Sequence, residues 1–327
     1  MYNLEINYRN KIIPKKIKLP YELEILQINK YLSKVYKDYD LFIDSNNTTF
    51  KAPNIPTISY VHFPRKSRVI NYQKKTQNKI NYSSIKYDLI NMVAKKLYKK
   101  DEIIRNNNSI IVNSEYSKRK FFDAYPSFKR EVEVIYPPID IKFSKNDERN
   151  SKSICSLGRF TEQKGQLKII KIAEKIKNFD FHLIGFAEKE NKYYQKCLNY
   201  IENKSIQNVF LHRNATHKEK NQILSKCTYF FHIMEDEPFG IITVEAIMNG
   251  LIPIVSNSGG QPEIVPIPEL TFNSLEEIPM SLKRFSSKED RISVLDILQK
   301  NIKKFDSKNF NEKFGLYFEN IIRGLKL

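Results

Sequence analysis

The sequence is poor in cysteine, and its glycines are confined to one part of the chain. Cys155, Cys197 and Cys227 are widely spaced and form no CxxC pair, which argues against a zinc site and a disulfide framework and fits a reducing compartment. All nine glycines lie from Gly158 onward. No apolar run approaches the roughly 20 residues of a membrane span. The first residues contain no apolar signal core, so we expect neither a membrane span nor export.

Charged residues, like the glycines, are distributed unevenly along the chain. The 327 residues carry a formal net charge of +18, and residues 1–150 hold 29 Lys and Arg against 16 Asp and Glu. A hydrophobic fraction of 41% excludes wholesale disorder, and the length suggests two domains. A basic half attracts polyanions, namely nucleic acid, an anionic membrane surface or a phosphorylated substrate. The alternative is a lysine-rich solvated surface without a partner.

Strands and helices alternate in the second half of the chain. Apolar runs predict strands at 154–157, 181–184, 209–211, 229–234 and 252–255. Between them, helical spacing predicts helices at 164–176, 193–201, 217–224 and 240–248. Continuous apolar strands joined by helices are typical of a doubly wound α/β domain with a parallel sheet.

The first half shows a similar but weaker pattern. We expect helices at 22–36 and 85–98, and strands at 41–43, 57–62, 110–113 and 132–135. Pro137 and Pro138 stiffen the chain and block a helix, so we place the interdomain linker at 136–146. An apolar face predicts a last helix at 309–325, which needs a surface to pack against.

In open parallel sheets, ligands bind beyond the carboxyl ends of the strands. Arg159 and Lys164 flank the loop that follows the strand at 154–157. We expect Lys164 to start the next helix, and a cationic loop beside a helix N-terminus suits a diphosphate. A purely structural loop is the alternative.

Two carboxylates follow the strand at 229–234. Glu237 lies just before a predicted helix that starts near Pro238, and Glu245 lies eight residues further on. Eight residues are close to two helical turns, so both carboxylates can face one way. Glu245 is flanked by apolar residues and needs hydrogen-bond donors, which sugar hydroxyls would supply. Alternatively, Glu237 caps the helix and Glu245 pairs with a nearby lysine.

Paired glycines, Gly259 and Gly260, follow the strand at 252–255 and permit close approach of a ligand or form a simple turn. In order and spacing, several segments of the chain resemble glycosyltransferase family 4, the retaining sugar-nucleotide transferases of the GT-B fold. These segments are VNSEYSKRKF (112–121), VEVIYPPID (132–140), GRFTEQKG (158–165), EPFGIITVE (237–245) and SGGQPEIV (258–265). YVHFP (60–64) is similar to a strand end in the lipid-linked-oligosaccharide α-1,2-mannosyltransferases of that family.

The resemblance implies a GT-B fold, with two Rossmann-like domains that face a cleft. Residues 1–138 would be a shortened acceptor-side domain, because no glycine precedes Gly158 and only about 60 residues precede His62, fewer than the family normally has. Residues 139–305 would bind the donor, and a helix within 306–327 would pack back on the first domain.

The resemblance also implies roles for individual residues. Arg159 and Lys164 would hold the donor diphosphate, Glu245 the ribose and Glu237 the transferred sugar, with His62 facing that sugar from the other domain. The donor-binding loops would contribute backbone at Gly158, Phe239, Gly240, Gly259 and Gly260. No metal or other cofactor is expected.

We therefore expect a hexosyltransferase that moves mannose or glucose from GDP-mannose or UDP-glucose to a glycan or lipid-linked acceptor. Basic and apolar residues interleave at 65–82, which is typical of peripheral docking on anionic lipid. We therefore expect a cytoplasmic protein that binds the cytoplasmic face of a membrane. Two alternatives remain: an inactive GT-B subunit that needs a partner, and a nucleic-acid-binding protein. The chain has no zinc-finger or RNA-binding aromatic motif, so we expect no nucleic acid partner.

Overall fold

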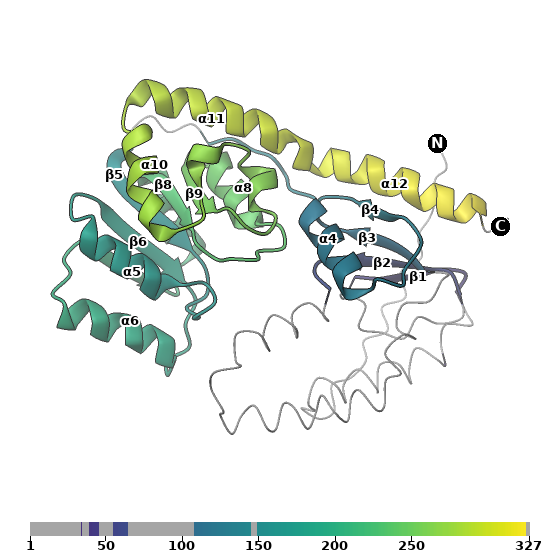
Figure 1. Ribbon diagram of the computed structural model, residues 1–327, viewed down its shortest axis with the longest axis horizontal. Coiled ribbons are helices and arrows are strands. Elements are labelled where there is room, and N and C mark those ends of the chain that lie inside the picture. The colour runs from purple at the N-terminus through teal and green to yellow at the C-terminus, as the bar shows by residue number, and fades with distance from the viewer. Residues whose placement is uncertain (1–33, 35–38, 46–54, 65–107, 145–148, 325–327) are drawn as a thin grey trace.

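The chain contains two separate parallel β-sheets, one of four and one of six strands, in a computed structural model (Figure 1). The structure describes residues 34, 39–45, 55–64, 108–144 and 149–324. The helices predicted at 22–36 and 85–98, apart from Lys34, and the basic segment 65–82 lie outside these residues. In the described part of the chain, no helix has both the length and the hydropathy needed to cross a bilayer.

The first sheet has the strand order β1-β2-β3-β4, and all neighbouring strands run parallel. Its strands are β1 (Phe42–Asp44), β2 (Thr57–Val61), β3 (Asn108–Val112) and β4 (Val132–Val134). They confirm the four predicted strands, each shifted by two residues or fewer at either end. Helix α4 (Glu115–Ala124), which the sequence analysis did not predict, follows β3 and begins at the N-cap Ser114.

The second sheet has the order β10-β9-β8-β5-β6-β7, again with parallel neighbours. Its strands are β5 (Asn150–Leu157), β6 (Asp180–Gly185), β7 (Val209–Arg213), β8 (Cys227–His232), β9 (Ile252–Ser256) and β10 (Thr271–Phe272). The central strands β8 and β9 are buried along their whole length, which explains their continuous apolar sequence. Apart from β10, all of these strands were predicted.

Helices cover both faces of this sheet (Figure 1). They are α5 (Gln166–Lys175), α6 (Lys192–Asn203), α7 (His217–Lys226), α8 (Ile241–Met248), α9 (Gln261–Ile264), α10 (Ile278–Arg284) and α11 (Lys288–Ile302). Short 3₁₀ turns lie at Pro268–Leu270, Leu275–Glu277 and Lys303–Phe305. The helices α5 to α8 confirm the predicted alternation, whereas α9, α10 and α11 were not predicted.

The last helix, α12 (Ser307–Gly324), continues beyond α11 and lies along the four-stranded sheet (Figure 1). Phe310, Phe314 and Tyr317 on this helix pack against a buried cluster that includes Ile58 and Ile111 of the sheet. The apolar face of the helix is therefore covered by the first sheet, although the helix follows the second sheet in sequence.

The strand order places a ligand-binding position in the second sheet. Strand β5 pairs with β6 on one side and with β8 on the other, so the direction of winding reverses between β5 and β8. In doubly wound sheets, ligands bind beyond the carboxyl ends of the strands at such a reversal. The loops that follow β5 and β8 carry Arg159, Lys164 and Glu237.

Candidate functional site

The loop after β5 turns sharply against the end of β6. A Cβ atom on Gly185 would lie 1.9 Å from the carbonyl oxygen of Gly158, so only glycine fits at position 185. A Cβ atom on Gly158 would lie 3.3 Å from the side chain of Lys164, whose stem therefore lies over this glycine. Arg159, between them in the chain, is exposed.

The expectation that Lys164 starts the next helix is wrong. Helix α5 begins at Gln166, because Gly165 serves as its N-cap with a φ of 73° in the left-handed region that favours glycine. Lys164 therefore lies in the loop, and its ammonium group contacts a partner on the neighbouring loop.

That partner is Glu237, in the loop after β8. Lys164 Nζ lies 2.8 Å from Glu237 Oε2, and the imidazole Nε2 of His232 lies 3.2 Å from the same oxygen. Burial raises the pKa of Glu237, but the hydrogen bond from His232 and the charge of Lys164 outweigh it and lower the pKa to about 2. Glu237 is therefore a fixed anion at every physiological pH.

The sequence analysis missed His232. Its side chain is 2% exposed, and burial lowers its pKa, so the neutral imidazole donates to Glu237. The residue ends a strand that is otherwise apolar (CTYFFH), and we interpreted the run as core. A histidine in the last position of a buried strand, at the carboxyl edge of a parallel sheet, is the signal that could have identified it.

The predicted two-turn relationship between Glu237 and Glu245 is also wrong. Gly240 is the N-cap of α8 with a φ of 116°, so the helix begins at Ile241 and Glu237 lies in the preceding loop. The carboxylates are not on one helical face, and Glu237 does not cap the helix.

Glu245 does lie inside α8, where it forms an ion pair with Lys220 of α7. The Glu245 side chain is 29% exposed, so part of the carboxylate is open to solvent. The structure, which holds no ligand, therefore has the alternative arrangement, in which Glu245 pairs with a nearby lysine.

The glycine pair after β9 allows two parts of the backbone to approach each other closely. A Cβ atom on Gly259 would lie 2.3 Å from the carbonyl oxygen of Glu237, and one on Gly260 would lie 2.6 Å from that of Pro238. The N–H of Gly260 donates to the Glu237 carbonyl oxygen at 2.8 Å. These glycines thus support the loop that carries Glu237.

Phe239 is 2% exposed, and its ring packs against Tyr136 and Phe305, with centroids 5.8 Å and 5.0 Å away. Its side chain is therefore part of the core, which leaves its backbone for contact with a ligand. His62 directly follows β2 in the other sheet, is exposed, and stacks edge-on with Tyr60 at 5.0 Å.

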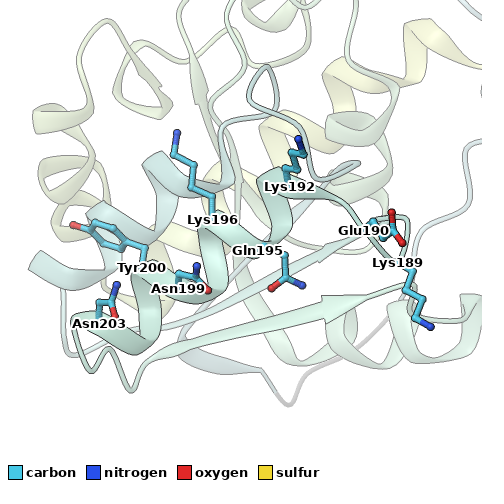
Figure 2. A pocket seen from close by; sticks show the side chains of 8 residues that line it. All are labelled: Lys189, Glu190, Lys192, Gln195, Lys196, Asn199, Tyr200 and Asn203. Atoms are coloured by element: carbon cyan, nitrogen blue, oxygen red, sulfur yellow. The ribbon is translucent and has the colours of Figure 1, made fainter.

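A shallow depression lies elsewhere, on the outer face of α6 (Figure 2). Its lining is formed by Lys189, Glu190, Lys192, Gln195, Lys196, Asn199, Tyr200 and Asn203. It includes none of the predicted site residues; apart from Lys189 and Glu190, which precede α6, its lining residues belong to that helix. Within the described ranges, no group of three or more His, Cys, Asp or Glu side chains could hold a metal ion.

Comparison with known proteins relates part of the chain to a known family. Residues 139–266 match the family of glycosyl transferases group 1. The GDP-Man:Man(3)GlcNAc(2)-PP-Dol alpha-1,2-mannosyltransferase of Dictyostelium discoideum is 23% identical over 324 residues, covering 86% of this chain and 64% of the relative. The chain thus spans slightly less than two thirds of the length of this curated relative.

Solved structures share the fold. Sucrose-phosphate synthase from Thermosynechococcus elongatus superposes with a TM-score of 0.72 at 15% identity, covering 96% of this chain and 81% of that one. HepE from Anabaena, solved in complex with UDP and glucose, gives 0.67 at 18% identity, with 92% and 84% covered. The chain has the GT-B fold, and the match of residues 139–266 to the glycosyl transferases group 1 family supports the resemblance to family 4 glycosyltransferases.

Proposed function

We propose that the protein is a retaining hexosyltransferase that moves mannose or glucose from a nucleotide diphosphate sugar to a glycan or lipid-linked acceptor. The observation that carries the proposal is the contact between Lys164 and Glu237 at the reversal point of the second sheet, with Arg159 on the same loop as Lys164. A cationic group and a fixed carboxylate at this place suit the two ends of an activated sugar.

In this proposal, positive side chains take the role of stabilising the leaving diphosphate. As the bond between sugar and phosphate breaks, negative charge grows on the phosphate and positive charge grows on the sugar ring. Arg159 and Lys164 offset the negative charge on the phosphate, and no metal is then required. Glu237 lies beside Lys164 and remains ionised because its pKa is about 2, so it stabilises the positive charge on the sugar ring. Glu245 accepts hydrogen bonds from the ribose.

The donor binds residues 139–305 and the acceptor binds residues 1–138, with His62 on the acceptor side. GDP-mannose is the favoured donor because the Dictyostelium relative is named for GDP-Man, and UDP-glucose is the second choice. The same name, with its PP-Dol group, supports a lipid-linked acceptor.

A panel of nucleotide sugars tests the donor. We expect one of them to raise the melting temperature of the protein and to be hydrolysed slowly when no acceptor is present. Glu245→Ala should weaken donor binding, and Arg159→Ala should lower turnover. The control is Arg284→Ala, which removes an exposed arginine of α10 that pairs with Asp290 of α11. The site assignment fails if both site variants behave like the parent.

Peripheral binding to the cytoplasmic face of a membrane is a separate part of the proposal. It rests on the net charge of residues 1–150, where Lys and Arg outnumber Asp and Glu by 29 to 16. Co-sedimentation should show binding to vesicles that contain anionic lipid and none to neutral vesicles. Equal binding to both, or binding to neither, contradicts this part.

A further inference from the structure

The first turn of α4 is capped by a carboxylate from the other half of the chain. Glu263 Oε1 accepts the N–H of Tyr116 at 2.9 Å, and its Oε2 accepts the N–H of Glu115 at 3.0 Å. The hydroxyl of Tyr136 donates to the same Oε2 at 3.0 Å. The first N–H groups of a helix have no partner inside the helix, and the helix dipole favours an anion there. Glu263 therefore joins α4 to α9, the short helix that follows β9.

Two side chains of the same turn reach the loop that carries Glu237. The hydroxyl of Ser114 donates to the carbonyl oxygen of Pro238 at 2.6 Å, and that of Tyr116 donates to Asp236 Oδ1 at 2.7 Å. Ser114 is 0% and Tyr116 is 6% exposed, so little water competes for these bonds. Glu237 lies between the two loop residues that are held in this way.

The backbone of this loop needs such support. Asp236 has a φ of 58°, in the left-handed region that few residues other than glycine, asparagine and aspartate adopt. Its N–H donates to Ser258 Oγ at 3.0 Å, so the residue is held by the loop after β9 on one side and by Tyr116 on the other. A strained conformation persists where several contacts fix it together.

These contacts define a domain clamp. It consists of Ser114, Tyr116, Tyr136, Asp236 and Glu263. We propose that the domain clamp positions the carboxylate of Glu237 by joining the loop at 235–240 and α9 to residues of the first half of the chain. Its members are positioning residues, which act on the donor through the loop at 235–240. The inference rests on the proposed function, because the position of Glu237 matters to turnover when that carboxylate meets the transferred sugar.

The domain clamp separates two properties of the enzyme. A nucleoside diphosphate lacks the transferred sugar that Glu237 would contact, so we expect its affinity to depend on side chains such as Arg159 and Glu245 and not on the clamp. Turnover of the nucleotide sugar depends on where Glu237 stands, and a displacement of about 1 Å at a reacting centre costs up to about 100-fold. Loss of the clamp should therefore lower kcat and leave nucleoside diphosphate binding unchanged.

The test uses the full chain and a single hydroxyl. Tyr116→Phe removes the bond to Asp236 and keeps the ring, which stacks on Phe63 with centroids 6.1 Å apart. We expect kcat for donor hydrolysis to fall about tenfold, while the Kd for GDP or UDP by calorimetry stays within twofold of the parent. The control is Tyr229→Phe, which removes a more deeply buried hydroxyl bond, to the carbonyl oxygen of Phe285 in the core. This variant should keep the kcat of the parent.

Two further variants make the outcome specific. Asp236→Asn keeps an acceptor for Tyr116 and tolerates the left-handed backbone, so it should retain most of the parent kcat. Glu263→Gln keeps the side-chain size and loses the charge that caps α4, so kcat should fall about threefold. If Tyr116→Phe does not fold, Glu263→Gln carries the same comparison.

Each outcome bears on one of the two claims. A parent chain that hydrolyses a donor, with Tyr116→Phe and Glu263→Gln variants that match it, overturns the clamp and leaves the proposed function in place. A change in GDP or UDP affinity as large as the change in kcat also overturns the clamp, because it shows general damage to the donor site. A parent that binds and hydrolyses no donor overturns the proposed function and the clamp with it.

Discussion

Replacement of Lys164 by methionine separates the structural and the chemical roles of the ion pair at the candidate site. Lys164 Nζ lies 2.8 Å from Glu237 Oε2, with the two side chains 23% and 18% exposed. Methionine has nearly the same length and no charge. The variant therefore leaves the carboxylate with His232 as its remaining partner and leaves a bound diphosphate with one cation fewer.

The magnitude follows from the pKa of Glu237, which is lowered from 4.5 to about 2. A shift of this size corresponds to about 3 kcal/mol of stability at neutral pH. His232 and Lys164 both contribute to it, so loss of the lysine should cost roughly 1 to 2 kcal/mol. For a domain of this size the melting temperature should fall by about 4 °C. If Lys164 also stabilises the leaving diphosphate, turnover should fall about 100-fold or more.

Thermal unfolding and donor hydrolysis are measured on the same samples, with Lys168→Met as the control. Lys168 Nζ lies 3.8 Å from Glu235 Oε1, and both side chains are 56% exposed, so this neighbouring pair is worth little. A Lys164→Met protein that melts and turns over like the control refutes the reasoning. A protein that is less stable but has full turnover shows that the pair is structural only.

Three other outcomes follow from the same geometry. Gly185→Ala should lower the yield of folded protein, because its Cβ would lie 1.9 Å from the Gly158 carbonyl oxygen, and circular dichroism checks this. Because the pKa of Glu237 is lowered, its stabilising contribution is present above pH 4.5 and is lost as the pH falls toward about 2; urea unfolding of the parent and of Glu237→Gln should therefore converge over that range. Lys220→Met should cost about 1 kcal/mol, measured by urea unfolding, because it breaks the half-buried pair with Glu245.

The strands and helices between residues 150 and 256 could be predicted because the second sheet is buried on both faces. Strand β8, for example, is an uninterrupted apolar run, and such runs stand out in any sequence. Helix α11 was missed because its buried positions, Val294, Leu298 and Ile302, are interspersed with exposed apolar residues such as Ile297, which blur the helical period. Helix α4 was missed because its apolar residues cluster in one turn near its end.

The sequence predicted which residues form the candidate site better than it predicted which of them are in contact. The motifs identified Lys164 and Glu237, yet no spacing in the sequence indicates that these two side chains touch across 73 residues. The helical argument for Glu245 failed because it assumed a regular helix through Gly240, whose left-handed φ ends that regularity. Side-chain contacts between loops depend on turn geometry, and a single glycine or aspartate with a positive φ redirects everything that follows it.

The candidate site contains an ion pair, Lys164 with Glu237, and an exposed arginine, Arg159. Lys164 is neutralised by Glu237 in the chain without a ligand, which lets both remain half-buried at little cost. Arg159 is exposed, and within the described part of the chain no hydrogen bond or ion pair involves its guanidinium group. In the proposed reaction a donor diphosphate would therefore contact Arg159 first, whereas Lys164 would attract it fully only when the negative charge that grows on the leaving group competes with Glu237. If the proposed function holds, Arg159 would contribute to capture of the donor, and Lys164 would contribute to the step that breaks the sugar–phosphate bond.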